Sequence, residues 1–157
     1  MLVSISEALG IGKFLQSVLQ VIWPPKIEGY IAERELIPDF EAALNGGWDI
    51  RDLLVYVKIA NTARTSVMDW VAAIKFSDGS SHRFTLSKRD SSDWLTVLDG
   101  RRGSPLDTGT ILEKNVTHEG WLWFRLAINM KEIESLRVLA VEPNKREHEI
   151  ASDSVTL

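Results

Sequence analysis

From residue 26 onward, hydrophobic and polar side chains alternate with a period of two, the pattern of β-strands that bury one face. The clearest run is 120–128, whose even members are all apolar: Leu122, Phe124, Leu126 and Ile128. The same alternation predicts strands at 27–32, 53–59, 70–76, 82–86 and 136–141. Turn residues at 77–80 join two of these runs into a predicted antiparallel hairpin, and short helices are predicted at 38–44 and 92–98. Closely spaced strands without helices between them favour an antiparallel β-sandwich.

The first residues carry a helical pattern instead. Between positions 4 and 22 apolar residues recur every three or four positions, Ser4 and Glu7 have the spacing of a capping box, and Pro24 and Pro25 follow. A signal peptide would need basic first residues and a small-residue cleavage site, and a membrane-spanning helix would not carry Lys13 near its middle. We therefore expect an amphipathic helix that packs against protein, or lies in a membrane interface. Protein is favoured because Lys13 is the only basic residue of the segment.

Three short stretches give the chain a family resemblance. Leu54-Val-Tyr-Val-Lys-Ile-Ala-Asn61, Met68-Asp-Trp70 and Gly120-Trp-Leu-Trp-Phe124 resemble the strands of bacterial immunoglobulin-like β-sandwich modules of uncharacterised function. The resemblance covers roughly residues 26–150 and implies a binding or structural role, often beside a membrane anchor. It carries over no catalytic residue. The excursion at 90–107 is a departure from this pattern, because a minimal sandwich would not need it.

Together these observations predict a mainly β protein, an antiparallel immunoglobulin-like β-sandwich with an N-terminal amphipathic α-helix. The expected parts are the helix and its Pro-Pro stop at 1–25, the β-sandwich domain at 26–150 and a C-terminal tail at 151–157. Within the domain, 136–141 is expected to be the last strand, followed by a turn at 143–146 and a short tail segment at 147–150.

Composition removes several classes of protein. The 157 residues include 18 basic and 22 acidic side chains, a net charge of −4, which argues against a nucleic-acid binder. The absence of cysteine excludes disulfides, thiolate metal sites and a cysteine nucleophile. A cytoplasmic protein, with association to a membrane surface left open, is the expectation.

Motifs that could carry chemistry are incomplete. Gly10-Ile-Gly-Lys13 lacks the first glycine and the Ser or Thr of a phosphate-binding loop, and His118-Glu119 lacks the second histidine of a zinc-protease motif. Ser81 and His82 are neighbours on a strand and so point to opposite faces. Arg101 and Arg102 form a basic loop tip that could contact a phosphate or an acidic partner, or be solvated. No catalytic residue, metal ligand or cofactor is predicted.

The six tryptophans give the best functional lead. Trp70 shares a face with the apolar members of its strand and is predicted to be core. Trp121 and Trp123 instead alternate with the core residues of 120–128 and share their face with Arg125, the composition of a contact surface. The alternative is that this face is covered by the N-terminal helix or by the excursion at 90–107. The sequence favours that alternative, because the apolar helix itself needs a surface.

Three functions remain open at this stage. The leading hypothesis is a non-enzymatic module that binds a protein partner or assembles with itself. The second is a membrane-peripheral accessory protein held by the N-terminal helix. The third is a small-ligand binder or an enzyme with its site near 90–118, for which the sequence identifies no substrate.

Overall fold

A computed structural model describes residues 25–38, 50–127 and 133–154. The predicted N-terminal helix and the predicted helix at 38–44 lie outside these residues, apart from Pro25 and Pro38 at their ends. No helix within the described ranges is long and apolar enough to cross a membrane.

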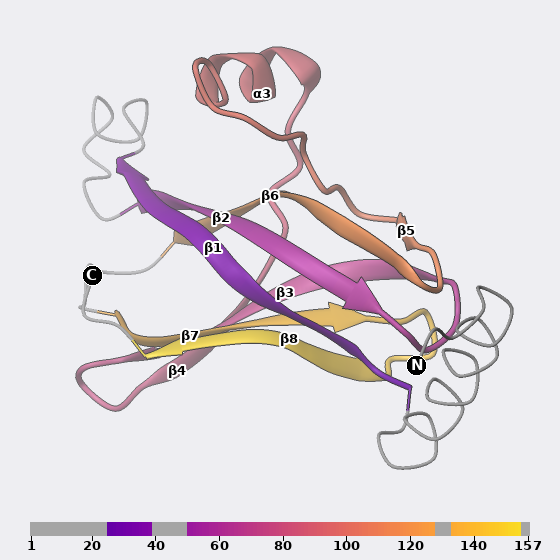
Figure 1. Ribbon diagram of the computed structural model, residues 1–157. Coiled ribbons are helices and arrows are strands. Elements are labelled where there is room, and N and C mark those ends of the chain that lie inside the picture. Colours follow the sequence, from indigo (N-terminus) through magenta and orange to yellow (C-terminus); the bar gives the residue numbers. More distant parts are fainter. Residues whose placement is uncertain (1–24, 39–49, 128–132, 155–157) are drawn as a thin grey trace, which may run out of the picture.

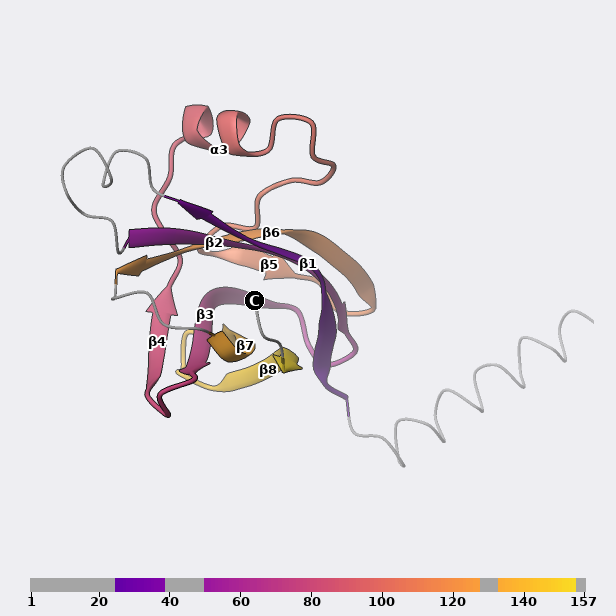
Figure 2. The same ribbon diagram turned by 90° about the vertical axis from the view of Figure 1, so that its left-hand side faces the viewer.

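The chain forms two antiparallel sheets that pack face to face (Figures 1 and 2). The three-stranded sheet has the order β1-β2-β6, with bounds Ile27–Pro38, Ile50–Asn61 and Val116–Ala127. The other sheet has five strands. Four of them follow the order β4-β3-β7-β8, with bounds Ser81–Thr85, Ser66–Phe76, Ile133–Val141 and Glu147–Ser154, and the fifth pairs with β3 alone. β5 (Thr110–Leu112) pairs with the start of β3, and the helix α3 (Ser91–Val97) lies on the outer side of the three-stranded sheet. These observations confirm a mainly β fold with antiparallel sheets.

The main core lies between the two sheets and is built from alternate residues of the strands. Leu53, Val55, Val57 and Ile59 of β2 are at most 1% exposed and face Trp70, Ile74 and their neighbours on β3 and β7. The predicted core position of Trp70 is thereby confirmed. At a rate of about 25 cal/mol per Å² of buried apolar surface, this layer is the main source of folding free energy.

All six predicted strands are present, and all but β4 are longer than predicted because polar residues extend several of them. The hairpin of β3 and β4 pairs Val71 with Thr85 through to Lys75 with Ser81, as expected from the turn at 77–80. The helical turn predicted at 92–98 is α3. β5 was not predicted, since three residues are too few to show an alternation.

The C-terminal strand corrects the sequence-based boundaries. β8 runs from Glu147 to Ser154, so residues 147–150 and the first four residues of the predicted tail belong to the sheet. The register between β7 and β8 shifts between Val138 and Leu139, and both Ile150 and Ala151 are buried. A bulge of this kind breaks the period of two, which is why the alternation did not predict this strand.

A buried carboxylate fastens the turn between β7 and β8 to the start of β3. Glu142 is 4% exposed. Its Oε1 accepts from both Arg64 and Ser66, each at 3.1 Å, and its Oε2 contacts Nε2 of His148 at 2.9 Å. The contact with His148, followed by those with Arg64 and Ser66, lowers the pKa of Glu142 from 4.5 to about 2 against the opposing effect of burial.

Glu142→Gln tests this fastening through the pH dependence of stability. Because the folded pKa lies below the unfolded one, the carboxylate stabilises the protein above pH 4.5, and this contribution is lost between about pH 4.5 and pH 2. We expect urea denaturation to show the variant less stable than the wild type at pH 7, with the difference shrinking as the pH falls. Glu134→Gln, at an exposed carboxylate, is the control; an equal pH dependence of both variants would contradict the assignment.

Candidate functional site

The outer face of the three-stranded sheet carries a second apolar cluster, which the chain itself covers. Leu54 and Tyr56 of β2 and Trp121 and Trp123 of β6 pack beneath Trp94 of α3. The ring centroids of Trp94 and Trp123 lie 5.1 Å apart at 81°, and those of Tyr56 and Trp121 lie 5.0 Å apart. The stretch from Ser87 to Asp107, which we call the cover segment, thus forms a third layer over this sheet (Figure 2).

Backbone hydrogen bonds attach the cover segment along the free edge of β6. At its start, Ser87 N–H donates to the carbonyl of Trp123 at 2.8 Å. Towards its end, Leu106 N–H donates to the carbonyl of Trp121 at 2.8 Å, and Trp121 N–H donates to the carbonyl of Ser104 at 2.9 Å. The indole N–H of Trp121 also donates to the carbonyl of Arg102 at 2.9 Å. The segment is therefore fixed at both ends.

Two arginines of the cover segment stabilise its contact with the tryptophans of β6. The guanidinium of Arg89 lies 4.4 Å from the ring centroid of Trp123, and that of Arg101 lies 5.6 Å from the ring centroid of Trp121, both within cation–π range. Arg89 also pairs with the buried carboxylate of Asp52 at 3.3 Å.

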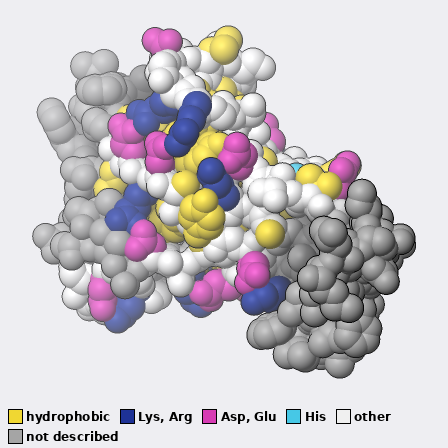
Figure 3. All heavy atoms as spheres, in the orientation of Figure 1, with side chains coloured by type: hydrophobic (Ala, Val, Ile, Leu, Met, Phe, Trp, Pro, Cys, Tyr) yellow, Lys and Arg dark blue, Asp and Glu magenta, His cyan; other side chains and the backbone are white. Residues whose placement is uncertain are grey.

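The basic loop tip has its acidic partners on β1. Arg101 pairs with Glu35, which raises the pKa of the guanidinium, and Arg102 lies 3.6 Å from Glu33. Figure 3 shows charged side chains of both signs interspersed around a small hydrophobic area on this side of the molecule. In the described part of the chain, Arg101 and Arg102 thus contact acidic side chains of the protein itself.

The three residues of the predicted contact face are therefore in different environments. Trp121 and Trp123 are 1% and 4% exposed beneath the cover segment, while Arg125 is exposed and its Nε lies 3.3 Å from Asp52. A partner could reach the two indoles only if the cover segment moved. Sequence reasoning missed the buried Asp52, which lies opposite Arg125 in the register of β2 and β6.

A cavity of about 610 Å³ lies between α3 and the returning half of the cover segment. Its apolar lining comes from Trp94, Leu95, Leu98 and Pro105, and its charged lining comes from Arg89, Arg101, Asp99 and Asp107. Leu95 is 75% exposed, whereas its neighbour Trp94 is the buried residue of α3. The volume falls within the range of small-molecule sites in proteins, about 300–1,000 Å³.

The three histidines lie at separate places. His82 packs edge-on against Phe76 with centroids 5.8 Å apart, His118 accepts from the backbone N–H of Glu113 at 2.9 Å, and His148 contacts Glu142. Within the described ranges, no group of three His, Cys, Asp or Glu side chains could hold a metal ion.

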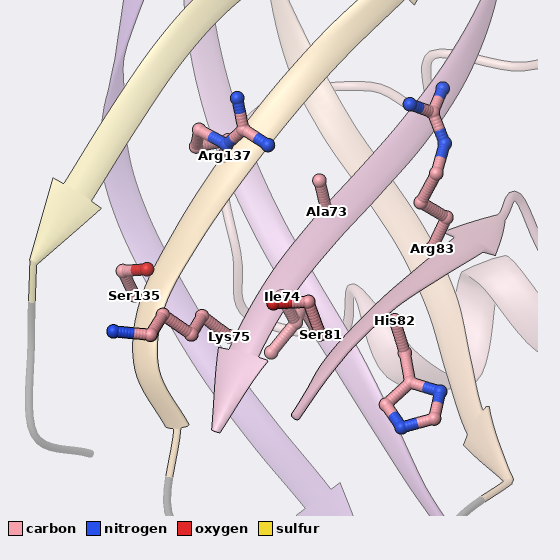
Figure 4. Close-up of a pocket in the computed structure, with 8 residues that line it drawn as sticks. All are labelled: Ala73, Ile74, Lys75, Ser81, His82, Arg83, Ser135 and Arg137. Carbon is pink, nitrogen blue, oxygen red and sulfur yellow. The ribbon is translucent and has the colours of Figure 1, made fainter. Parts of the chain in front are cut away.

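The outer face of the five-stranded sheet carries a hollow of about 440 Å³, which we call the basic depression. Its centre is Ala73 on β3, and it is lined by Lys75, Arg83, Arg137, Ser81 and Ser135 together with Ile74 and His82. Figure 4 shows Arg83 and Arg137 on the strands to either side of Ala73, and His82 pointing away from both. Because the alanine side chain is short, the surface is lower at Ala73 than at the two long cationic side chains beside it. The strand register, which places Ala73 between these two side chains, therefore produces the hollow.

Among the residues that the structure describes, the lining of the basic depression holds three cations and no carboxylate. Each cation reaches an acidic side chain outside the hollow: Lys75 reaches Glu134 at 3.0 Å, Arg137 reaches Glu149 at 3.5 Å, and Arg83 makes two hydrogen bonds to Glu147. All six side chains are between 41% and 53% exposed. Exposed pairs of this kind stabilise a fold by no more than about 1 kcal/mol each.

Comparison with known proteins does not place the chain in a group. No family model matches the sequence, and no curated protein matches it either.

Gly120→Ala tests how the cover segment is held. A Cβ at Gly120 would lie 2.5 Å from the carbonyl oxygen of Ser104 and 2.7 Å from Cγ of Leu106, so the segment would have to shift from β6. We expect a loss of about 2 kcal/mol in the free energy of unfolding and a red shift of tryptophan fluorescence as the indoles meet water. Gly79→Ala is the control, since its Cβ would meet nothing within 4 Å. It should lose stability through backbone strain alone (φ +87°), and an equal red shift there would argue against the proposed attachment.

Proposed function

We propose that the protein is a non-enzymatic, immunoglobulin-like module that binds an acidic segment of a protein partner through the outer face of β4-β3-β7-β8. The strand order supports the immunoglobulin-like relationship. In sequence order the strands correspond to A, B and E in one sheet and to C′, C, F and G in the other, with β5 as an addition. Domains of this architecture serve unrelated functions, so the proposed role depends on the surface.

One observation carries the proposal: the molecule covers the outer face of one sheet and leaves a basic hollow on the other. The cover segment occupies the aromatic face of the three-stranded sheet. In the described part of the chain, no such layer lies over the basic depression. An exposed sheet face with three cations around a low floor is complementary to an acidic segment.

Site-specific photo-cross-linking tests the proposal. A photoreactive phenylalanine at the exposed Thr85, two residues from Arg83 on β4 and outside the lining of the depression, should cross-link a partner in cells of the natural host, whereas the same group at Thr117 on the other sheet should not. Combining the probe at Thr85 with Arg83→Glu and Arg137→Glu should reduce the adduct at least about tenfold, since two attractive charges become repulsive.

Lys58→Glu with Arg102→Glu is the matched control, because it reverses two ion-paired cations away from the depression. An adduct that survives the reversal at Arg83 and Arg137, or falls equally in the control, would refute the proposed surface. Thermal unfolding of every variant shows whether the fold is retained.

A second candidate function, small-ligand binding, is favoured by the cavity beside α3. The cavity combines an apolar lining with the exposed Leu95, and Trp94, which lines it, has an indole N–H that is buried without a hydrogen-bond partner. Buried hydrogen-bond donors without a partner are uncommon in native proteins. An apolar ligand with an acceptor group would suit this cavity.

Anilinonaphthalene sulfonate, an aromatic anion with fluorescence sensitive to burial, is a suitable probe for this cavity. We expect saturable fluorescence with the native protein and binding about fivefold weaker in Leu95→Glu, because the variant places a charge beside apolar surface. Thr96→Glu introduces the same charge at the next residue of α3, which does not line the cavity, and should bind as the wild type does. Equal binding by both variants would contradict a site at this cavity.

A further inference from the structure

We infer that the basic depression recognises a phosphate monoester carried by the protein partner. This inference rests on the proposed function, because it names the chemical group that the same surface would take. It depends on the arrangement of donors around Ala73 and on the carboxylates that already contact them.

The register of three strands brings the donors together. Ala73 lies directly opposite Arg83 on β4 and Arg137 on β7. Lys75, two residues along β3, lies opposite Ser81 and Ser135. Two adjacent rows therefore present Arg–Ala–Arg and Ser–Lys–Ser on one face. With strands about 4.8 Å apart, the two arginine backbones are separated by about 10 Å, so both side chains can reach a group above Ala73.

These donors match a phosphate better than they match a carboxylate. A phosphate monoester carries three acceptor oxygens and close to two negative charges at pH 7, and arginine forks bind such oxygens in pairs. The two serine hydroxyls and the lysine ammonium add donors at further positions around the same hollow. A planar carboxylate has too few oxygens to engage all of them.

Competition with the protein's own glutamates sharpens the choice of ligand. Arg83 and Arg137 already contact Glu147 and Glu149. A carboxylate from a partner would replace one such contact with an equivalent one, and so would gain little. A dianion gains charge and acceptors in the exchange, and the half-exposed glutamates can turn to water when displaced.

The test uses isotope-labelled full-length protein and three pentapeptides, Gly-Gly-X-Gly-Gly, in which X is phosphoserine, serine or glutamate. Amide and arginine Nε shifts are followed at constant ionic strength, with inorganic phosphate as a fourth probe. We expect saturable shifts at Ala73, Arg83 and Arg137, with the phosphoserine peptide bound at least about tenfold more tightly than the glutamate peptide. Inorganic phosphate should shift the same signals.

Four variants separate a built site from general attraction to positive charge. Arg83→Gln with Arg137→Gln should weaken phosphopeptide binding at least about tenfold, while Lys58→Gln with Arg102→Gln, at exposed ion pairs elsewhere, should not. Ala73→Leu keeps every charge but fills the floor, and should weaken binding to a similar degree. Glu147→Gln with Glu149→Gln removes the competing carboxylates and should tighten binding about three- to fivefold.

The outcomes distinguish this inference from the function on which it rests. Equal affinity for the phosphoserine and glutamate peptides, or unchanged binding by Ala73→Leu, would overturn phosphate recognition. If the partner cross-link at Thr85 still depends on Arg83 and Arg137 in that case, the binding surface stands with a partner that is acidic but not phosphorylated. Phosphopeptide binding without a charge-dependent cross-link would support the phosphate site and overturn the proposed protein-binding role.

Discussion

The structure depends on the burial of β2 on both of its faces. Val55 and Val57 face the core between the sheets, whereas Leu54 and Tyr56 face outward and are equally buried. A three-stranded sheet with two apolar faces needs a layer on each side. The five-stranded sheet supplies one layer and the cover segment supplies the other, so the excursion that departs from a minimal sandwich is required by this strand.

Charges have different roles on the two sides of the sandwich. Around the cover segment, Arg89 and Arg101 stack over indole rings and reach Asp52 and Glu35, so their charges hold packed layers together. On the five-stranded sheet the ion pairs hold no further layer in the described part of the chain, and each cation is half-exposed. The first set is therefore bound to the architecture, and the second is free to exchange partners.

The sequence predicted the secondary-structure elements more fully than it predicted which elements lie side by side in the fold. Alternation located the core strands because burial on one face leaves a period of two in the chain. It could not locate β8, where a bulge places Ile150 and Ala151 both inside. It also could not reveal the basic depression, since Arg83 and Arg137 become neighbours of Ala73 only through strand register. For Trp121 and Trp123 the sequence left three coverings open, namely a partner, the N-terminal helix and the excursion at 90–107. The choice depended on which distant segment follows the edge of β6.

The path of the chain keeps the two candidate sites independent although they are close in sequence. β4 carries Arg83 on the five-stranded sheet; Leu86 then bridges to Phe124 of the other sheet, and the cover segment begins at Ser87. Arg89, which lines the cavity beside α3, is thus only six residues from Arg83 but lies against a different sheet. The main core separates the two sites, and backbone hydrogen bonds to β6 fix the crossing between them. A substitution that alters binding at both sites would therefore act through the fold, because none of the described side chains lines both.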